Sequence, residues 1–231
     1  MSLRSIALAA ILLATPLTAQ VGDRPVVVEL FTSQGCSSCP PADDFLAELA
    51  ERDNVIALSL HVDYWDYLGW QDPFASPAMT ARQRAYAARQ GTRSVFTPQM
   101  IVQGQLSAVG HRRPEVNAAI AAVADRAGAT VELMRVEDHL EVRIAPLRPD
   151  LSGTVHVVSY DEPHVQDIAR GENGGRRLTY TNVVTGWMTL GRWNGQDMRT
   201  TIPMPVMGRG VAVLVQDGEA GPILGAAKLE P

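Results

Sequence analysis

Cysteine is scarce in this 231-residue sequence, which holds only Cys36 and Cys39. Because four-ligand structural zinc sites usually draw on two such pairs, a single pair disfavours one. Lysine is almost absent too, with Lys228 alone, and the formal net charge is −5 without runs of like charge. Nucleic acids and anionic membrane surfaces attract clustered positive charge, so neither is an expected partner. The sequence also lacks G-x-S-x-G, HExxH and phosphate-loop motifs, and we predict no cofactor and no metal site.

Long hydrophobic runs are equally scarce, and the clear one, at residues 6–14, lies near the N-terminus. Arg4 precedes this run and small residues around Ala19 follow it, which is the pattern of a secretory signal peptide over residues 1–19. The run is too short for a transmembrane helix, which needs about 20 residues. We therefore expect an exported protein, periplasmic or secreted, without a membrane span. A lone cysteine pair in such a compartment is oxidised by default.

Hydrophobic periodicity divides the remaining sequence into an α/β domain, residues 20–128, and a β-rich domain, residues 129–231. In the first domain, β-branched apolar runs indicate buried strands and amphipathic segments indicate helices. A strand–helix–strand order predicts parallel strands. The expected elements of this domain are strands at 26–31, 55–65, 99–104 and 106–110 and helices at 41–52, 77–90 and 114–127.

The β-rich domain shows alternation without a helical period, and turn signals such as Asn194-Gly195 separate its segments. Short strands at that spacing predict an antiparallel sandwich or barrel, so we expect a β-sandwich-like fold. Residues 170–175, RGENGG, indicate a hairpin connection whose charges could contact the first domain. Two roles stay open for this domain: recognition of a substrate or partner, and structural cover over the first sheet.

The cysteine pair lies between a predicted strand and a predicted helix, in the sequence VVVELFTSQGCSSCPP. Free amide groups and the positive end of the dipole at a helix N-terminus favour the thiolate form of a nearby cysteine. Cys36, on the loop side, is predicted to be the more exposed and nucleophilic of the two, and Cys39 to resolve a mixed disulfide. Because a residue before proline avoids helical geometry, we predict that the helix starts at Pro41 and that both cysteines lie in the preceding turn.

The order of these features resembles the thioredoxin superfamily: strand VVVELF, motif CSSC, strand VIALSLHVDYW, a helix, and then TRSVFTPQMIVQGQLSAVG. The resemblance implies a thioredoxin-like domain, a cis peptide bond before Pro98, and a substrate groove lined by Thr97 and Pro98. It also implies that Glu29, an acid in the first strand, accepts the proton of the resolving thiol. The segments LFTSQGCSSCPPAD and HVDYWD are similar, more narrowly, to an uncharacterised family of secreted bacterial thioredoxin-like proteins.

His61, Asp63 and Trp65 alternate at the end of the second predicted strand. That end borders ligand crevices in open α/β sheets. We predict that His61 and Asp63 form a polar wall of the substrate site beside the cysteines, with Asp63 orienting His61. Ordinary core and loop packing is the alternative.

These features favour thiol–disulfide exchange with protein or peptide thiols and disulfides, catalysed by Cys36, Cys39 and Glu29. The dipeptide between the cysteines is Ser-Ser, so the family's reduction potentials, about −270 to −120 mV, transfer only as a range. Two alternatives stay open. The pair could be an inert structural disulfide of a binding protein, or it could relay copper together with a histidine and Met100 as soft or borderline ligands.

Overall fold

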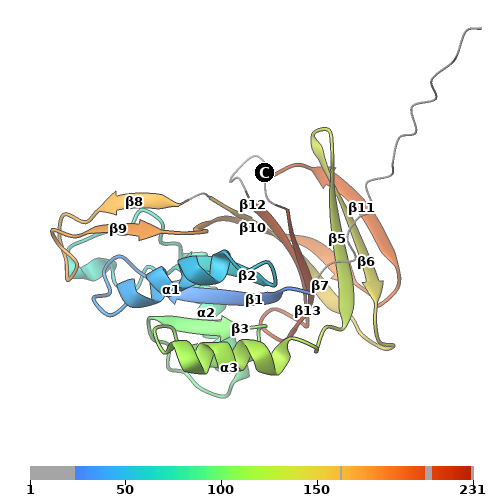
Figure 1. The fold of residues 1–231 in the computed structure, drawn as a ribbon, viewed down its shortest axis with the longest axis horizontal. Helices are drawn as coiled ribbons and strands as arrows, with labels where there is room; N and C mark the ends of the chain where they lie inside the picture. The colour runs from blue at the N-terminus through green and yellow to red at the C-terminus, as the bar shows by residue number, and fades with distance from the viewer. Residues whose placement is uncertain (1–23, 162, 206–209, 230–231) are drawn as a thin grey trace, which may run out of the picture.

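The computed structural model of the protein describes residues 24–161, 163–205 and 210–229. The signal peptide predicted at residues 1–19 lies outside these described residues. The fold is mixed α/β with several sheets, and strands dominate it (Figure 1). Across the described residues, no helix combines the length and the apolar character needed to cross a membrane.

The first sheet has the strand order β2-β1-β3-β4. Its strands are β1 (Val26–Thr32), β2 (Val55–His61), β3 (Gln99–Val102) and β4 (Leu106–Val109). β1 and β2 are parallel, as predicted, because a helix carries the chain back across one face of the sheet between them. β3 runs antiparallel to both β1 and β4.

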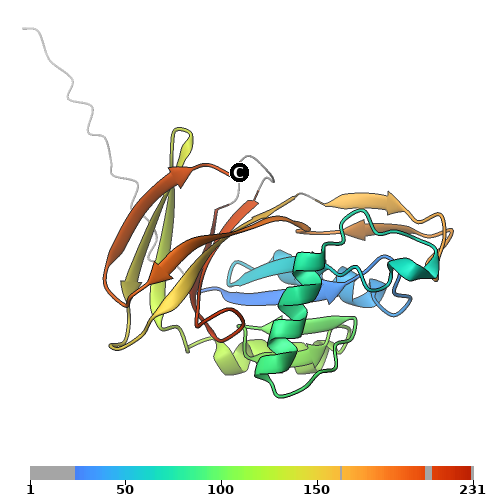
Figure 2. The same ribbon diagram turned by 180° about the vertical axis from the view of Figure 1, so that it is seen from behind.

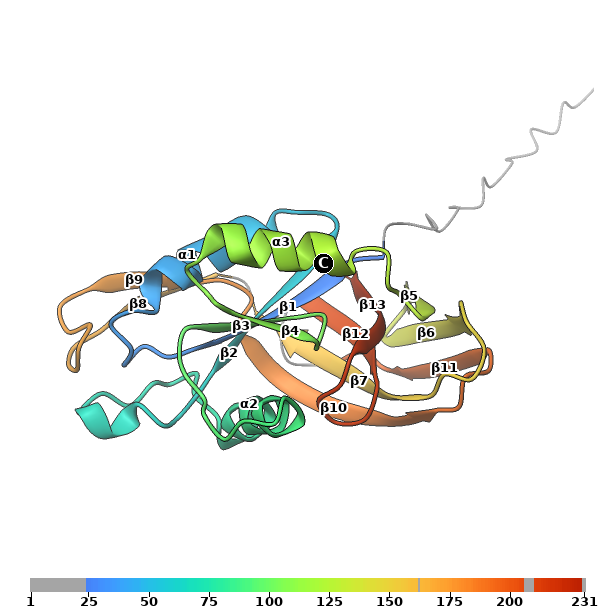
Figure 3. The same cartoon turned by 90° about the horizontal axis from the view of Figure 1, so that it is seen from below.

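Helices cover both faces of the first sheet. Figure 3 shows α1 (Pro40–Ala50) and α3 (Arg113–Val123) on one side of it and α2 (Pro77–Arg89) on the other. Residues of β1 alternate between these faces, as the pleat of a strand requires. Those that pack under α1 and α3 are Val26, Val28 and Leu30.

β2 is shorter than its predicted span of 55–65. Its last residue, His61, pairs with Thr32, the last residue of β1. Beyond that pair the chain has no partner strand, and it turns away through the short 3₁₀ helix η1 (Asp66–Leu68).

The second half forms two antiparallel sheets, with strand orders β10-β7-β12-β13 and β11-β6-β5. Their strands are β5 (Ala129–Val136), β6 (His139–Pro146), β7 (Gly153–Tyr160), β10 (Val184–Trp193), β11 (Met198–Pro203), β12 (Gly210–Gln216) and β13 (Ile223–Leu229). Apolar side chains of both sheets, including Val142, Val157 and Val213, form one cluster between them. This pair of sheets is the antiparallel sandwich that the alternation predicts.

The central strands β7 and β12 of the sheet β10-β7-β12-β13 are buried on both faces. In β12, Val213 points into the sandwich, whereas Leu214 joins a second cluster with Phe31 of the first sheet. That cluster fills the face of the first sheet that α2 also covers, and Figure 2 shows α2 beside this sheet. The first strand after the boundary expected near residue 128, β5, starts at Ala129, and a shared apolar core joins the two halves.

A hairpin of β8 (His164–Asp167) and β9 (Arg177–Tyr180) leaves the sandwich and lies beside α1 (Figure 1). After β9 the chain runs along the edge of β2, where the amide of Ser59 donates to the carbonyl of Asn182 over 2.9 Å. The second half thereby reaches the carboxyl ends of β1 and β2, where the cysteines lie.

Candidate functional site

Cys36 and Cys39 form a disulfide in the connection between β1 and α1, residues 33–39, which we call the cysteine loop. Two successive turns shape this loop. The amide of Cys36 donates to the carbonyl of Ser33 (3.1 Å), and the amide of Cys39 donates to the carbonyl of Cys36 (3.2 Å). The disulfide thus closes a short ring directly after the first buried strand.

The start of α1 differs from the prediction. The helix begins at Pro40, and Cys39 is its N-cap with helical backbone angles. The preference of a residue before proline for extended geometry is overridden here, because the Cys39 carbonyl accepts hydrogen bonds from the amides of Ala42 (2.8 Å) and Asp43 (3.1 Å). Cys39 therefore lies at the helix terminus itself, and Cys36 lies three residues before it.

Both cysteines are buried, with Cys36 1% and Cys39 0% exposed. Ser37 and Ser38 between them are exposed. Cys36 was predicted to be the more exposed of the two, but the structure leaves both cysteines almost without exposure. Residues of the second half of the chain contact the main chain of this loop, and periodicity alone does not place them there.

The end of the β8–β9 hairpin, residues 168–176, contacts the cysteine loop, and we call it the hairpin tip. The side-chain amide of Asn173 donates to the carbonyls of Gln34 and Cys36, each over 2.9 Å. Its carbonyl oxygen accepts from the guanidinium of Arg176 over 2.8 Å. Asn173 is 1% exposed, so it links the tip to the cysteine loop with its hydrogen-bonding groups satisfied.

Glu172 makes a second, exposed contact with the same loop. Its carboxylate accepts a hydrogen bond from the amide of Ser37 over 3.2 Å. The hydroxyl and the amide of Ser37 together lower the pKa of Glu172. The prediction that residues 170–175 connect a hairpin is confirmed, and one of their charges does contact the first half.

The peptide bond between Thr97 and Pro98 is cis. The indole of Trp65 donates to the Thr97 hydroxyl over 2.8 Å. The same Trp65 packs against the cysteine loop, since a Cβ added to Gly35 would lie 3.0 Å from the Trp65 Cβ. Trp65 therefore links Thr97 to the cysteine loop.

Glu29 lies elsewhere. Its carboxylate accepts from the guanidinium of Arg82 over 2.6 Å and from the hydroxyl of Tyr86, both on α2. This is the face of the first sheet opposite α1, and none of the described contacts joins Glu29 to either cysteine. The structure does not bring the predicted proton acceptor to the pair.

His61 has a carboxylate partner, but it is not Asp63. Its Nδ1 lies 2.7 Å from Asp72, and both side chains are fully buried. Burial pushes the pKa of Asp72 upward, yet His61 and the amide of Gln34 outweigh that effect and lower the pKa. Asp63 instead accepts from the hydroxyl of Thr80 over 2.5 Å. The predicted orienting role of Asp63 is wrong because the chain turns after β2 and carries Asp72 back over His61.

Asp43 is a buried acid that sequence reasoning missed. It lies one turn after Cys39 on α1 and is 5% exposed. Burial raises its pKa well above the usual range, while the nearby Thr32 hydroxyl opposes the shift and the carboxylates of Asp44 and Asp72 reinforce it. The spacing of four residues between Asp43 and Cys39 is the signal that could have found it, because residues i and i+4 share a helix face.

Several polar atoms near Asp43 are buried without a hydrogen-bond partner among the described residues. They include the carboxyl oxygens of Asp43, the Nε2 atom of His61 and the hydroxyl of Tyr180. The rings of His61 and Tyr180 are 5.0 Å apart. Burial raises the pKa of Tyr180, and the charges of Asp43 and Asp72 add to that effect. A polar cluster with unused hydrogen-bonding capacity therefore lies behind the disulfide.

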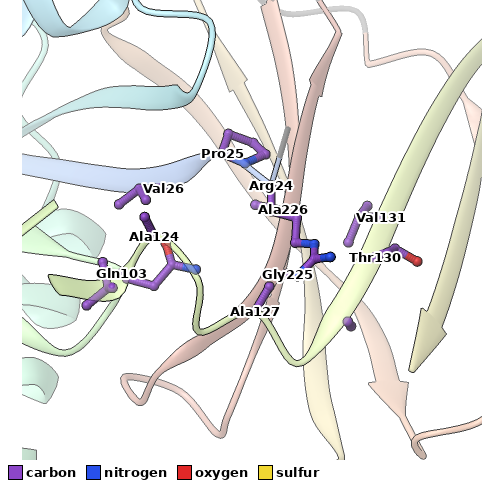
Figure 4. A pocket seen from close by; sticks show the side chains of 12 residues that line it. Arg24, Pro25, Val26, Gln103, Ala124, Ala127, Thr130, Val131, Gly225 and Ala226 are labelled. Atoms are coloured by element: carbon purple, nitrogen blue, oxygen red, sulfur yellow. The ribbon is translucent and has the colours of Figure 1, made fainter. Parts of the chain in front are cut away.

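Three cavities in the described part of the chain have no cysteine among their lining residues. One of about 30 Å³, room for a single water, lies where β1 begins, at the opposite end of that strand from the disulfide. Figure 4 shows Val26, Gln103 and Ala124 among its lining residues. Within the described ranges, no group of three or more His, Cys, Asp or Glu side chains is placed to hold a metal ion.

Comparison with known proteins gives a family. A crystal structure of a protein from Agrobacterium tumefaciens is 32% identical to this chain, covers 89% of it and 93% of its own chain, and has a TM-score of 0.79. HBP35 of Porphyromonas gingivalis, at 16% identity, covers 90% of this chain and 75% of its own with a TM-score of 0.59, and so shares the fold. Comparison with curated proteins gives no match. Residues 27–216 match the family described as "Protein of unknown function (DUF1223)", and the chain therefore belongs to that family.

Proposed function

We propose that this protein carries out thiol–disulfide exchange through Cys36 and Cys39. The observation that carries the proposal is the position of the disulfide at the N-terminus of α1. Trp65 links the same loop to Thr97, which precedes the cis-proline Pro98. A helix N-terminus favours a thiolate through its free amides and its dipole. The strand order β2-β1-β3-β4 with flanking helices supports a thioredoxin-like first domain as part of the same proposal.

The exchange has two steps. A thiolate of a partner dithiol attacks the sulfur of Cys36, which forms a mixed disulfide and releases Cys39 as a thiolate. The second thiol of the partner then attacks the mixed disulfide and releases Cys36. Two electrons and two protons pass from the partner to the pair, and the partner leaves as a disulfide. In the reverse direction, the Cys36 thiolate attacks a partner disulfide, and Cys39 then attacks the mixed disulfide and re-forms the Cys36–Cys39 bond. Two electrons and two protons pass from the pair to the partner, which leaves as a dithiol.

Asp43 takes the proton-handling role that we had predicted for Glu29. Because burial raises its pKa, Asp43 holds a proton at a pH where an exposed carboxyl would have lost it. It is positioned one turn from Cys39, on the helix that begins at that residue. It can donate this proton to the Cys39 thiolate as the disulfide opens and take it back as the disulfide forms.

The proposed partners are protein or peptide thiols and disulfides in an oxidising compartment. The signal-peptide pattern at residues 1–19 supports export to the periplasm or the medium. Small thiols do not keep a cysteine pair reduced in an oxidising compartment. Exchange at this pair there therefore requires a protein or peptide partner.

Trapping of mixed disulfides tests the proposal. In Cys39→Ser the resolving thiol is gone, so Cys36 should accumulate covalent adducts with partner proteins, seen as reductant-sensitive bands in non-reducing gels. Cys36→Ser removes the attacking sulfur and should give far fewer adducts. Equal and negligible trapping by both variants would refute the exchange function.

One observation favours a second candidate, an inert structural disulfide in a non-catalytic binding protein. Cys36 and Cys39 are 1% and 0% exposed, as an unreactive disulfide would be. In that case Cys36→Ser and Cys39→Ser should lower the thermal stability equally and trap nothing. The exchange function instead predicts that the two variants differ in trapping.

A further inference from the structure

We propose that the hairpin tip, residues 168–176, competes with the partner for the cysteine loop and must be displaced before the disulfide can exchange. This inference concerns regulation of the same site and rests, for its biological meaning, on the proposed exchange function. The effect of the tip on access to the disulfide follows from the contacts of the tip with the cysteine loop, whether or not the protein exchanges disulfides with a partner.

The sulfur atoms of the disulfide are poorly accessible in this structure. Exchange requires a thiolate to approach a disulfide sulfur closely, so its rate depends on access to that sulfur. With Cys36 at 1% and Cys39 at 0% exposure, the closed structure offers no such approach. The serines between the cysteines are exposed, whereas the cysteines are not, and the hairpin tip is bound to the main chain on both sides of the Cys36 side chain, at Gln34 and at Cys36 and Ser37.

The contacts between the hairpin tip and the cysteine loop resemble those that a bound peptide would make. The tip binds main-chain groups of the loop: Asn173 donates to the carbonyls of Gln34 and Cys36, and Glu172 accepts from the amide of Ser37. An extended peptide presents amide donors and carbonyl acceptors of the same kind along its own backbone. A peptide partner can therefore take over the groups that the tip leaves, which a small thiol cannot do.

The base and the tip of the hairpin are held differently. Aromatic packing holds the base, where the ring centroid of Tyr180 lies 5.0 Å from that of His61 and 6.0 Å from that of Phe74. The tip meets the loop through the polar contacts of Glu172 and Asn173, and glycines with φ of 77° and 80° flank them at positions 171 and 175. Glycine changes backbone conformation at little steric cost. The tip can therefore leave the loop while the base stays in place.

The rate at which dithiothreitol reduces the protein's own disulfide tests this inference, followed by alkylation of the free thiols and mass spectrometry. Asn173→Asp keeps the shape of the side chain but replaces the donor to the two carbonyls with a carboxylate. We expect it to speed reduction about tenfold or more, because two hydrogen bonds are lost and repulsion replaces them. Asn117→Asp on α3 adds the same charge to a residue whose oxygen accepts from Arg52, and it should leave the rate unchanged.

Glu172→Ala provides a second variant with little risk to folding, since this side chain is exposed. It removes the acceptor for the Ser37 amide and should speed reduction about threefold. Asp167→Ala, which breaks an exposed ion pair with Arg177 on the same hairpin, should not. If both loop-facing variants are reduced as slowly as the wild-type protein, the tip does not control access.

These outcomes are separable from those of the trapping experiment. Faster reduction in Asn173→Asp, together with no adducts in Cys39→Ser, would support the cover and refute the exchange function. Adducts in Cys39→Ser with unchanged reduction rates in both tip variants would support the exchange function and refute the cover.

Discussion

Two buried polar clusters flank the first sheet, and they differ in how completely they are hydrogen-bonded. The paired cluster, on the α2 face, consists of Glu29, Arg82, Tyr86 and Gln216. The Tyr86 hydroxyl donates to Glu29 and accepts from Arg82 (2.8 Å) and Gln216 (2.9 Å). The unpaired cluster, behind the disulfide, consists of Asp43, His61 and Tyr180, each with a buried polar atom that lacks a partner among the described residues.

The difference separates a structural role from a functional one. A buried polar group that keeps its hydrogen bonds rigidifies the core around it, whereas an unpaired one costs stability. The paired cluster joins α2 to the sandwich, since the guanidinium of Arg82 also lies 4.0 Å from the Trp187 ring centroid. The polar atoms of the unpaired cluster that lack partners form no hydrogen bond that would link its elements. In the proposed exchange reaction one of these groups has a role, because Asp43 lies one turn from Cys39 and would hold and move its proton.

The largest expected effect comes from removing one hydroxyl from each cluster. Tyr86→Phe leaves Glu29, Arg82 and Gln216 each short of a buried partner, so it should lower the free energy of unfolding by about 2–3 kcal/mol. Tyr180→Phe removes a hydroxyl without a partner and should be neutral, or stabilising by up to about 1 kcal/mol. Urea denaturation of both variants measures the difference. If both variants lose the same free energy of unfolding, the two clusters do not differ in their contribution to stability.

A smaller effect concerns the pH dependence of stability. Burial raises the pKa of Asp43 in the folded protein above its value in the unfolded chain. The stabilisation from its protonated form is therefore complete below the unfolded pKa, about 3.9, and is lost as the pH rises through the folded pKa. Asp43→Asn lacks that loss, so its melting temperature should exceed the wild-type value by more at pH 8 than at pH 5. Asp44→Asn, at an exposed position of the same helix, serves as the control, and identical pH profiles for the two variants would contradict the assignment.

Local pattern predicted most of the first domain. Apolar β-branched runs gave the strands, and the pair of prolines and the spacing of Phe45, Leu46 and Leu49 gave α1, because these signals depend on residues close in the chain. The helix start was wrong by one residue, since hydrogen bonds to the Cys39 carbonyl outweighed the preference of a residue before proline.

The candidate site was predictable only in part, because its polar contacts join distant segments. Asp72 displaced Asp63 as the partner of His61 once the chain turned at residue 62. Asn173 reaches Cys36 across 137 positions, and the turn signal in RGENGG predicts a hairpin without saying what it touches. Burial of Glu29 was a sound expectation, but the face it occupies depends on the pleat of β1, which placed it against α2.

The reduction potential of the Cys36–Cys39 pair tests the central claim most directly. Equilibration of the wild-type protein in dithiothreitol and glutathione redox buffers, followed by alkylation and mass spectrometry, gives the ratio of dithiol to disulfide at each potential. Thiol–disulfide exchange predicts a reversible two-electron transition with a midpoint between about −270 and −120 mV. A pair that stays oxidised until below about −300 mV would be a structural disulfide and would contradict the account.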